Sequence, residues 1–459
     1  MSPYLVFLAN EERLRANISY QLRNVFRSAG DDPVTLGRSA LSATVTSALR
    51  DDWLWVDFTG RIANISASPV GPLSFDPVIN NVNVTEVRAF SISPYIRSSS
   101  GYADYELRYT YRTSNLSGLL GRTSQAGSAF ATTGNRLGRW VLGWNGTTQQ
   151  ITRGDGRTIG RNFSTGSLSY SVNPELQVGA TINYDQIDGL TGSNGRDYGY
   201  GPGALVNWRP NTRTSLSANF ARRYFGNTSL VNFDHRLRWL TFSVNHTRQI
   251  LSSADGDIFF FNPGSLGATG GGGVPFNPVF SQLLTQGLLQ FGLTPFDLAF
   301  LTSALVQTER TSVSVGAVGQ HNSLLFNVFH NRRRSRGETD TSLTPNDGPR
   351  DQGGTSATGS FSGEAIQRGM QLTYRHRLDA RSSVSLTTRR TDIEVSGFAG
   401  GFAAPGNTSL MQYSASYSSR LTTDTIASVL IRRTSQDRTG QLGANFTENA
   451  IVGTLDVRF

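Results

Sequence analysis

The most regular feature of the chain is an alternation of apolar and polar residues in many short segments. Tyr105, Leu107 and Tyr109 alternate with Glu106 and Arg108. Successive side chains of a β-strand point to opposite faces, so this period of two predicts a strand with one apolar and one polar face. A helix would scatter both sets around its surface.

The same alternation recurs along the chain. Further apolar rows are Val178, Ala180, Ile182 and Tyr184, then Leu324, Phe326 and Val328, then Met411, Tyr413, Ala415 and Tyr417. A tilted strand of about 10 residues crosses a bilayer, and an apolar row opposite a polar row describes a barrel wall with a wet interior. A strand of a soluble sandwich is the alternative interpretation of any single segment, but one sandwich needs fewer strands.

The connections between these segments alternate in length. Short turns are predicted at 50–52, 98–101, 173–175, 210–212, 321–322, 379–381 and 422–424, with longer loops at 66–85, 337–360 and 397–407. Bacterial barrels have short periplasmic turns and long extracellular loops. We therefore predict an all-β fold, a large antiparallel transmembrane β-barrel with about 21 visible strands, as a single domain over residues 1–459.

Both ends of the chain carry specific patterns. Leu455, Val457 and Phe459 form the outer row of the last alternating segment, which resembles the signal read by the outer-membrane assembly machinery. Near the start, residues 2–20 repeat the hairpin pattern of residues 93–109. Because bacterial single-chain barrels have even strand numbers, we expect one strand to be missing before Met1 and the complete barrel to have about 22.

One segment, residues 251–309, breaks the alternation and is too long for a structureless connection. It contains a glycine run at 270–273 and two short apolar stretches, 278–291 and 296–306, the second after a capping Thr-Pro pair. We predict an extracellular insertion with two short helices that narrows the barrel mouth. A small external cap without a gating role is the alternative.

Composition agrees with a strand-rich membrane protein. Hydrophobic residues make up 37% and charged residues 16% of the chain, with 49 glycines and no cysteine. A compact α/β enzyme carries more Leu, Ala, Glu and Lys. The net charge of +9 favours an anionic membrane surface or an acidic polymer as partner. No nucleic-acid-binding motif accompanies the charge, so nucleic acid is not expected.

Motifs that carry catalysis were sought and not found in the sequence. The five histidines, His235, His246, His321, His330 and His376, lack metal-ligand spacing. There is no nucleophile elbow and no haem motif, and the glycine run is followed by Val274-Pro275 instead of the Lys-Ser/Thr of a phosphate-binding loop. We therefore expect no catalytic residue, no metal and no cofactor.

The alternation divides the polar residues between the lumen and the outer rim. The expected lumen-lining residues are Asp104, Glu106, Arg108, Arg112, Gln177, Thr181, Asn183, Gln412, Ser414 and Ser416. Arginine clusters near the outer strand ends are Arg222, Arg223, Arg332, Arg333, Arg334, Arg389, Arg390, Arg432 and Arg433. Neighbours on a strand face opposite ways, so each cluster should divide between lumen and rim. Rim members could bind lipopolysaccharide phosphates or simply extend their charge to the membrane interface.

Three segments carry a resemblance to a known family. They are residues 52–57, with the sequence DWLWVD; Ser93-Pro94-Tyr95 together with residues 103–111; and residues 221–228, with the sequence ARRYFGNT, leading to His235-Arg236. On these segments, the chain resembles outer-membrane barrels associated with the PEP-CTERM protein-sorting system, whose genes lie among exopolysaccharide genes. The resemblance covers nearly the whole chain. The resemblance implies a bacterial outer-membrane location and suggests polysaccharide export.

These observations predict a non-enzymatic outer-membrane conduit for exopolysaccharide or another polar or anionic polymer. The alternative is a structural or anchoring barrel with a plugged lumen that holds a surface assembly or a partner protein. An outer-membrane hydrolase is a third hypothesis, which a cluster of His, Ser and acidic residues at one rim would favour. Expected partners are outer-membrane lipid and lipopolysaccharide, the assembly machinery, a polysaccharide cargo and a protein in the lumen or at the surface.

Overall fold

The computed structural model describes residues 4–27, 34–50, 53–66, 84–116, 119–153, 156, 158–188, 196–223, 226–251, 305–336, 361–399, 402–403, 406–423, 425–439 and 445–457. Within these residues, no helix has the length and apolarity that crossing a membrane requires. Almost all of the described backbone is β-strand.

The strands are β1 (Tyr4–Asn10), β2 (Leu14–Arg27), β3 (Val34–Arg50), β4 (Leu54–Ser66), β5 (Val84–Ser99), β6 (Asp104–Leu116), β7 (Leu119–Thr132), β8 (Trp140–Arg153), β9 (Thr158–Asn173), β10 (Leu176–Asp188) and β11 (Arg196–Asn211). They continue as β12 (Thr214–Arg223), β13 (Gly226–Arg236), β14 (Leu240–Leu251), β15 (Leu305–Val318), β16 (Asn322–Arg336), β17 (Phe361–Arg377), β18 (Ser382–Ala399), β19 (Phe402–Ala403), β20 (Gly406–Arg420), β21 (Thr425–Thr439) and β22 (Phe446–Val457). One 3₁₀ turn, η1 (Gly134–Arg136), lies between β7 and β8.

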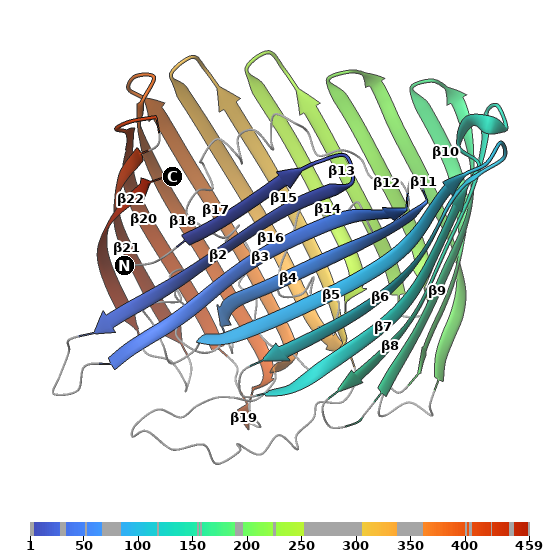
Figure 1. Cartoon of the computed structure of the whole chain (residues 1–459), viewed down its shortest axis with the longest axis horizontal. Helices are drawn as coiled ribbons and strands as arrows, with labels where there is room; N and C mark the ends of the chain where they lie inside the picture. Colours follow the sequence, from blue (N-terminus) through green and yellow to red (C-terminus); the bar gives the residue numbers. More distant parts are fainter. Residues whose placement is uncertain are drawn as a thin grey trace.

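All these strands belong to one 22-stranded antiparallel sheet. Each strand pairs with the next in the chain, except that β18 pairs directly with β20 and the two-residue β19 extends the end of β18. Setting β19 aside leaves 21 strands, which confirms the all-β antiparallel prediction. The strands are tilted and curve into a continuous wall around a central space (Figure 1).

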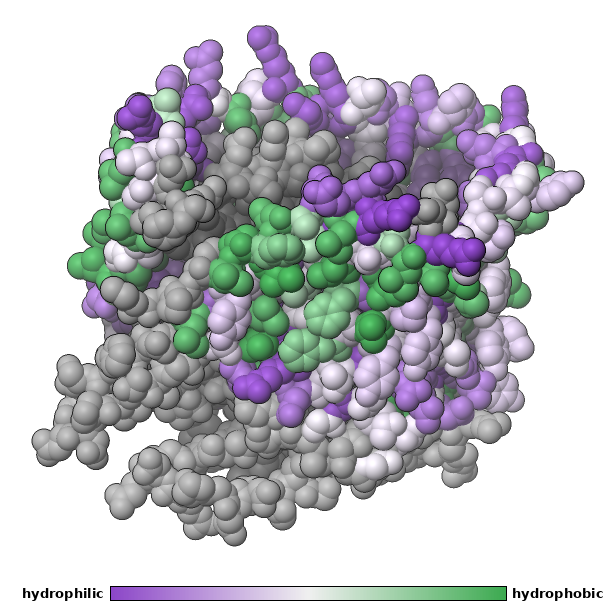
Figure 2. Space-filling view, viewed as in Figure 1, coloured by the Kyte–Doolittle hydropathy of each residue, from purple (hydrophilic) through white to green (hydrophobic). Residues whose placement is uncertain are grey.

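The outer side of the wall is apolar because every second residue of each strand lies on it. Leu107 on β6, Ile182 on β10 and Tyr413 on β20 are 59%, 64% and 51% exposed. Soluble monomers rarely expose contiguous apolar surface on this scale, whereas a lipid-facing wall requires it. Figure 2 shows hydrophobic side chains gathered in a band across the front wall, with hydrophilic side chains along the rim above it.

The connections at one end of the wall, the upper end in Figure 1, are all short. They follow β1, β3, β5, β7, β9, β11, β13, β15, β17 and β20. At the opposite end the connections after β6 and β12 are also short, but the longest ones, after β4, β14 and β16, all lie there. The longest loops are therefore at the end predicted, although each predicted short turn differs from the observed one by one or two residues. By the usual rule the short-turn end faces the periplasm and the other end faces outside.

The two edges of the sheet are β1 and β22. β1 pairs with β2, β22 pairs with β21, and within the described residues no backbone pairing joins the two edges. The strand expected before Met1 stays a prediction.

The limits of the predicted insertion are wrong at both ends. Leu251 is the last residue of β14, and residues 305–309 belong to β15, where Leu251 pairs with Val306. The helix expected over 296–306 therefore cannot include its last two residues, because backbone pairing with β14 and β16 draws them into the sheet. The rest of the insertion, with its glycine run and first expected helix, lies outside the described residues. The loop expected at 397–407 is also shorter, because β18 runs to Ala399 and β20 begins at Gly406.

Candidate functional site: the polar lumen face

The inner side of the wall carries the polar half of the alternation. On β6, Asp104, Glu106, Arg108 and Arg112 lie opposite the exposed Tyr105, Leu107, Tyr109 and Tyr111. On β10 the inner residues include Gln177, Thr181 and Asn183, and on β20 they include Gln412, Ser414 and Ser416. The register between neighbouring strands places all these residues on the lumen side, where hydroxyl, amide and charged groups can bind water or sugar.

An ionic network occupies the lumen wall toward the short-turn end. Arg108 donates to Asp57 at 2.6 Å and to Glu106 at 3.0 Å, and Arg97 donates to Glu106 at 2.7 Å. The Arg108 guanidinium lies 3.9 Å from the centre of the Tyr95 ring. Because each charge has opposite-charge or aromatic partners on β4, β5 and β6, the network fixes these side chains against the wall.

A second network lies where the wall bends most sharply. Arg223 on β12 forms an ion pair with Asp185 on β10, which is completely buried, and also contacts Asn183 at 3.4 Å. Both Arg223 and Arg161 lie over the Phe163 ring, at 6.0 and 4.8 Å from its centre. Within the described residues, the Oδ2 atom of Asp185 has no hydrogen-bond partner.

Glycines on the inner side of β11 make this contact possible. The inner residues opposite Thr181 and Asn183 are Gly203 and Gly201. A Cβ atom at Gly201 would lie 1.6 Å from the carbonyl oxygen of Arg222, and one at Gly203 would lie 2.3 Å from Oγ1 of Thr181. Cα atoms of β10 and β12 come within 8 Å across β11, closer than the roughly 9.5 Å of two flat strand spacings.

The arginine clusters divide between the two faces. Arg223, Arg333, Arg389 and Arg432 lie on the lumen side, the last three buried, whereas Arg222, Arg332, Arg334, Arg390 and Arg433 lie on the outer side and are exposed. Arg432 donates to Glu448 at 2.6 Å. The alternation within each cluster therefore supplies both the lumen wall and the outer rim with positive charge.

The outer side changes from apolar to polar at the same level in neighbouring strands. Register pairs link His246, Thr311, His330, Arg368 and Asp392 across β14–β18 in one row. Next to this row Arg332 forms an ion pair with Glu364, and Arg390 contacts Asp392 at 3.1 Å. Exposed pairs of this kind contribute only about 0–1 kcal/mol, so their position is more informative than their strength: it marks the long-loop boundary of the apolar band.

The histidines are dispersed over the wall. His235 contacts Thr214 at 2.9 Å, His246 contacts Ser229 and Thr311 at 2.8 Å, and His376 contacts Asn322 at 2.7 Å. Among the described residues, no group of three or more His, Asp or Glu side chains is arranged to hold a metal ion. Of the expected assembly signal, Leu455 is 65% exposed on the outer side and Val457 ends β22, while Phe459 lies outside the described residues.

Sequence reasoning missed several members of the lumen networks. Asp185 lies two residues after Asn183 on the same face of β10, so the alternation that selected Thr181 and Asn183 could also have identified Asp185 as a lumen residue. Asp57 and Arg97 lie on strands that were predicted without assigning their faces, and only the register with β6 brings them to Arg108 and Glu106.

Comparisons with known proteins identify the fold. No family model and no curated protein matches the sequence. The FrpB iron transporter from Neisseria meningitidis, F5-1 variant, is similar in structure, with a TM-score of 0.53 and 8% identity over 98% of this chain and 78% of that protein. Its F3-3 variant gives a TM-score of 0.53 and 8% identity over 99% of this chain and 78% of that protein. The siderophore receptor PirA from Acinetobacter baumannii gives a TM-score of 0.46 and 10% identity over 98% of this chain and 74% of that protein.

The chain is an outer-membrane β-barrel. The apolar outer band, the turn asymmetry and the shape of these neighbours agree on this fold and on its location in the outer membrane. At 8% identity the likeness concerns fold, so the function of the barrel has to be argued from its own lumen.

Proposed function

We propose that the barrel is a non-enzymatic conduit for a polar or anionic polymer, with exopolysaccharide as the cargo. The observation that carries the proposal is the chemistry of the lumen face. From β4 to β21 its inner positions hold Ser, Thr, Asn, Gln and Arg side chains, of which Arg112, Gln177, Gln412 and Ser416 are partly exposed examples. Such groups exchange hydrogen bonds between water and sugar hydroxyls at little net cost.

The width of the barrel supports passage of a polymer. Side chains fill the interior of a barrel of about 8 strands, barrels of about 16–18 strands leave an aqueous channel, and those of about 22 enclose a lumen wide enough to hold a plug. The net charge of +9 and the inward arginines favour an anionic polymer over a cationic one. The resemblance to barrels of exopolysaccharide loci is what suggests a polysaccharide.

Passage can be tested directly with the full chain. Reconstituted in planar bilayers, the barrel should give ion conductance that neutral dextran fragments and polygalacturonate fragments both reduce while they occupy the lumen. Liposomes containing the barrel should also swell in solutions of short oligosaccharides. A barrel that is folded by heat-modifiability on gels but neither conducts nor admits sugars would contradict the conduit.

A second function, anchoring with a filled lumen, is favoured by one observation. Toward the long-loop end the inner side chains are almost fully buried, including Asn331 at 1%, Gln367 at 1% and Arg389 at 3%. Polar groups lining an open, wide channel would be more exposed. Absence of conductance together with a partner that co-purifies in stoichiometric amounts would favour anchoring.

A further inference from the structure

One dipeptide recurs at the short-turn end of the barrel. Arg-Leu stands at 136–137, 236–237, 377–378 and 420–421, each time where a strand or 3₁₀ turn gives way to the following turn, and a fifth copy at 13–14 stands where a turn gives way to β2. The first four copies belong to the hairpins β7–β8, β13–β14, β17–β18 and β20–β21, which are spread around the wall (Figure 1).

The two residues of the dipeptide face opposite sides of the wall. Arg236 pairs with Thr241 and Arg377 with Ser383, and both partners are buried on the lumen side. Arg420 lies on the inner face of β20, whereas Tyr417, three residues before it, lies on the outer face. Arg136 reaches the lumen-side Asp104, which it contacts at 2.6 Å.

The leucines point away from the lumen. Leu137, Leu237, Leu378 and Leu421 are 47%, 44%, 52% and 55% exposed. Leu237, Leu378 and Leu421 continue the outer apolar row of their strands to the first residue after the strand, and Leu137 follows the 3₁₀ turn η1. Each of these four copies therefore presents an apolar side chain to the membrane and a guanidinium to the mouth of the barrel.

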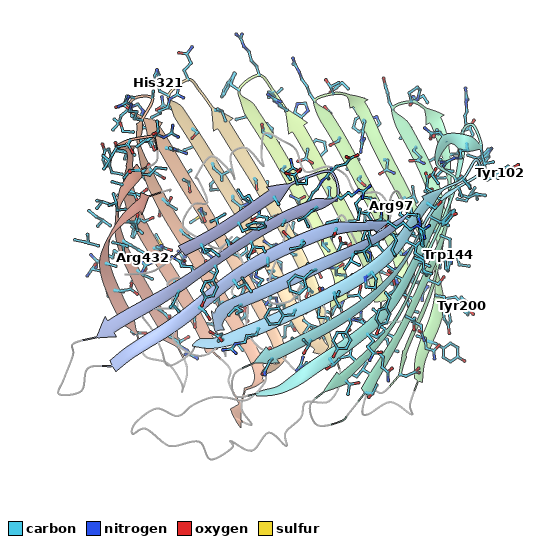
Figure 3. All side chains as sticks on the ribbon, in the orientation of Figure 1. Arg97, Tyr102, Trp144, Tyr200, His321 and Arg432 are labelled. Carbon is cyan, nitrogen blue, oxygen red and sulfur yellow. The ribbon has the colours of Figure 1, made fainter. Side chains whose placement is uncertain are left out.

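Other arginines enlarge this set. Exposed arginines at the same end are Arg13, Arg50, Arg97, Arg139, Arg209, Arg213, Arg238 and Arg381. We call these, together with Arg136, Arg236, Arg377 and Arg420, the basic collar. Hydrophilic side chains project above the short turns along this rim in Figure 2, and Figure 3 labels Arg97 on the front wall.

Carboxylates of the same end offset only part of the collar. Asp104 is held by Arg136 and Ser99, Glu106 by Arg97 and Arg108, and the Asp379 carboxylate accepts hydrogen bonds from its own turn. Arg209, Arg236 and Arg420 are exposed, and the described residues give their guanidinium groups no acidic partner. The exposed Glu11, Glu12 and Glu175 lie in turns of the same end as well. Because arginine stays protonated at any physiological pH, the guanidinium groups of the collar keep their positive charge.

The geometry points to a polyanionic polysaccharide as the ligand of the basic collar, captured at the periplasmic mouth before it enters the lumen. An arginine fork binds a carboxylate through two parallel hydrogen bonds, and several forks around one mouth can engage successive charges of one linear chain. Inner-leaflet phospholipids are less suited as ligands, because the leucines and not the arginines face the membrane. This inference rests on the proposed conduit and gives it a direction, from the periplasm outward.

Binding to the full-length barrel in lipid nanodiscs tests the collar. Fluorescent polygalacturonate fragments serve as the polyanion, with dextran fragments of equal length as the uncharged comparison. We expect saturable binding of polygalacturonate alone, weakening as salt is raised. The variant R236Q/R377Q/R420Q should bind about tenfold more weakly, since each exposed ion pair changes the affinity by a factor of at most about five.

The matched control is R334Q/R368Q/R433Q. It removes the same charge from exposed arginines on the outer side of the long-loop end, and it should bind as the unmodified barrel does. Equal affinities of the collar variant and the control variant for polygalacturonate would show that the collar is not the binding site. Tighter binding of poly-L-glutamate than of polygalacturonate at matched charge overturns the polysaccharide assignment in favour of an acidic protein.

Conductance of the same preparations distinguishes the proposed conduit from polyanion binding by the collar. A barrel that binds polygalacturonate through the collar but does not conduct contradicts the conduit and supports binding by the collar. A conducting barrel whose collar variant binds normally contradicts binding by the collar and supports the conduit.

Discussion

Arg223 on β12 forms an ion pair with Asp185 on β10, although β11 lies between the two strands. The side chain crosses β11 where the lumen face has only glycine, at Gly201 and its neighbour Gly203. The Asp185 carboxylate is 1% exposed, so its charge depends on the hydrogen-bonded Arg223, with Arg161 as a second cation nearby. The pair therefore connects three strands at the sharpest bend of the wall.

The first prediction concerns this ion pair. R223A should lower the free energy of unfolding by about 3–5 kcal/mol, because it removes the arginine that is hydrogen-bonded to the buried Asp185 charge. R222A, which removes the next arginine on the exposed outer side, should change it by less than about 0.5 kcal/mol. Urea unfolding in lipid vesicles, followed by tryptophan fluorescence, measures both. Equal effects of the two substitutions would show that the pair does not stabilise the bend, and D185N added to R223A should recover part of the loss.

The second prediction concerns the glycines. G201A should prevent folding or lower the free energy of unfolding by about 1–3 kcal/mol, because its Cβ atom would overlap the carbonyl oxygen of Arg222. G453A is the matched control on β22, since no atom lies within 4 Å of the added methyl group. Heat-modifiability on gels and urea unfolding report the outcome. A fully folded G201A barrel of unchanged stability would mean that the bend is softer than the structure shows.

The third prediction concerns pH and the turn between β17 and β18. Hydrogen bonds from the Ser382 side chain and from the backbone N–H groups of Arg381 and Ser382 lower the pKa of Asp379 from its ordinary value of 3.8. A depressed folded-state pKa contributes stability that is present above the unfolded pKa and is lost as pH falls through the folded pKa. The barrel should thus be more stable than D379N at pH 7.

The difference between the barrel and D379N should shrink as the pH is lowered below about 3.9, the ordinary pKa of an aspartate. E175Q in the β9–β10 turn is the control, because the described residues give the Glu175 carboxylate no hydrogen bond. Unfolding midpoints measured from pH 7 downward test this. A stability difference that does not change with pH would show that the Asp379 charge is not what stabilises the turn.

The fourth prediction concerns orientation. A cysteine at Ala380, in a short turn, should react with a membrane-impermeant maleimide only after the outer membrane is disrupted. A cysteine at Ser342, between β16 and β17 at the opposite end, should react on intact cells. The chain has no cysteine of its own, so labelling is specific. The reverse result would invert the barrel and place the basic collar outside the cell.

The fifth prediction concerns the connection between β14 and β15. Deleting residues 270–302 should raise single-channel conductance if this connection narrows the mouth. Deleting residues 340–356, in the other long connection, is the control for loop loss in general. Unchanged conductance in a folded barrel would identify the connection as a docking surface and favour anchoring.

Much of the fold could be predicted because the alternation acts on every strand separately. Tyr105 and Leu107 against Glu106 and Arg108 fix the two faces of β6 without any knowledge of its neighbours. The same parity argument predicted that Arg389 and Arg390 face opposite sides of the wall, and the structure shows which of them faces the lumen. These predictions follow from the local geometry of a strand, so the spacing of residues in the sequence is enough to make them.

The contacts between strands could not be predicted in the same way. Asp57 and Arg108 are 51 residues apart, and their meeting depends on the register of two intervening hairpins. Arg223 reaches Asp185 only because β11 bends over glycine, which is a property of three strands together. The end of the insertion was misplaced for a related reason: Val306 and Gln307 join the sheet through pairing with β14, which a short apolar run does not reveal.

Pairing between chain neighbours has a further consequence for how such a wall can change. Apart from the two-residue β19, every strand adds to the sheet beside the strand that precedes it, with no crossover. Removing or inserting a complete hairpin therefore leaves every remaining strand in its original direction, whereas removing a single strand would force two neighbours to run parallel. The circumference of the barrel can accordingly grow or shrink in steps of one hairpin, and each step brings its own short turn to the periplasmic mouth.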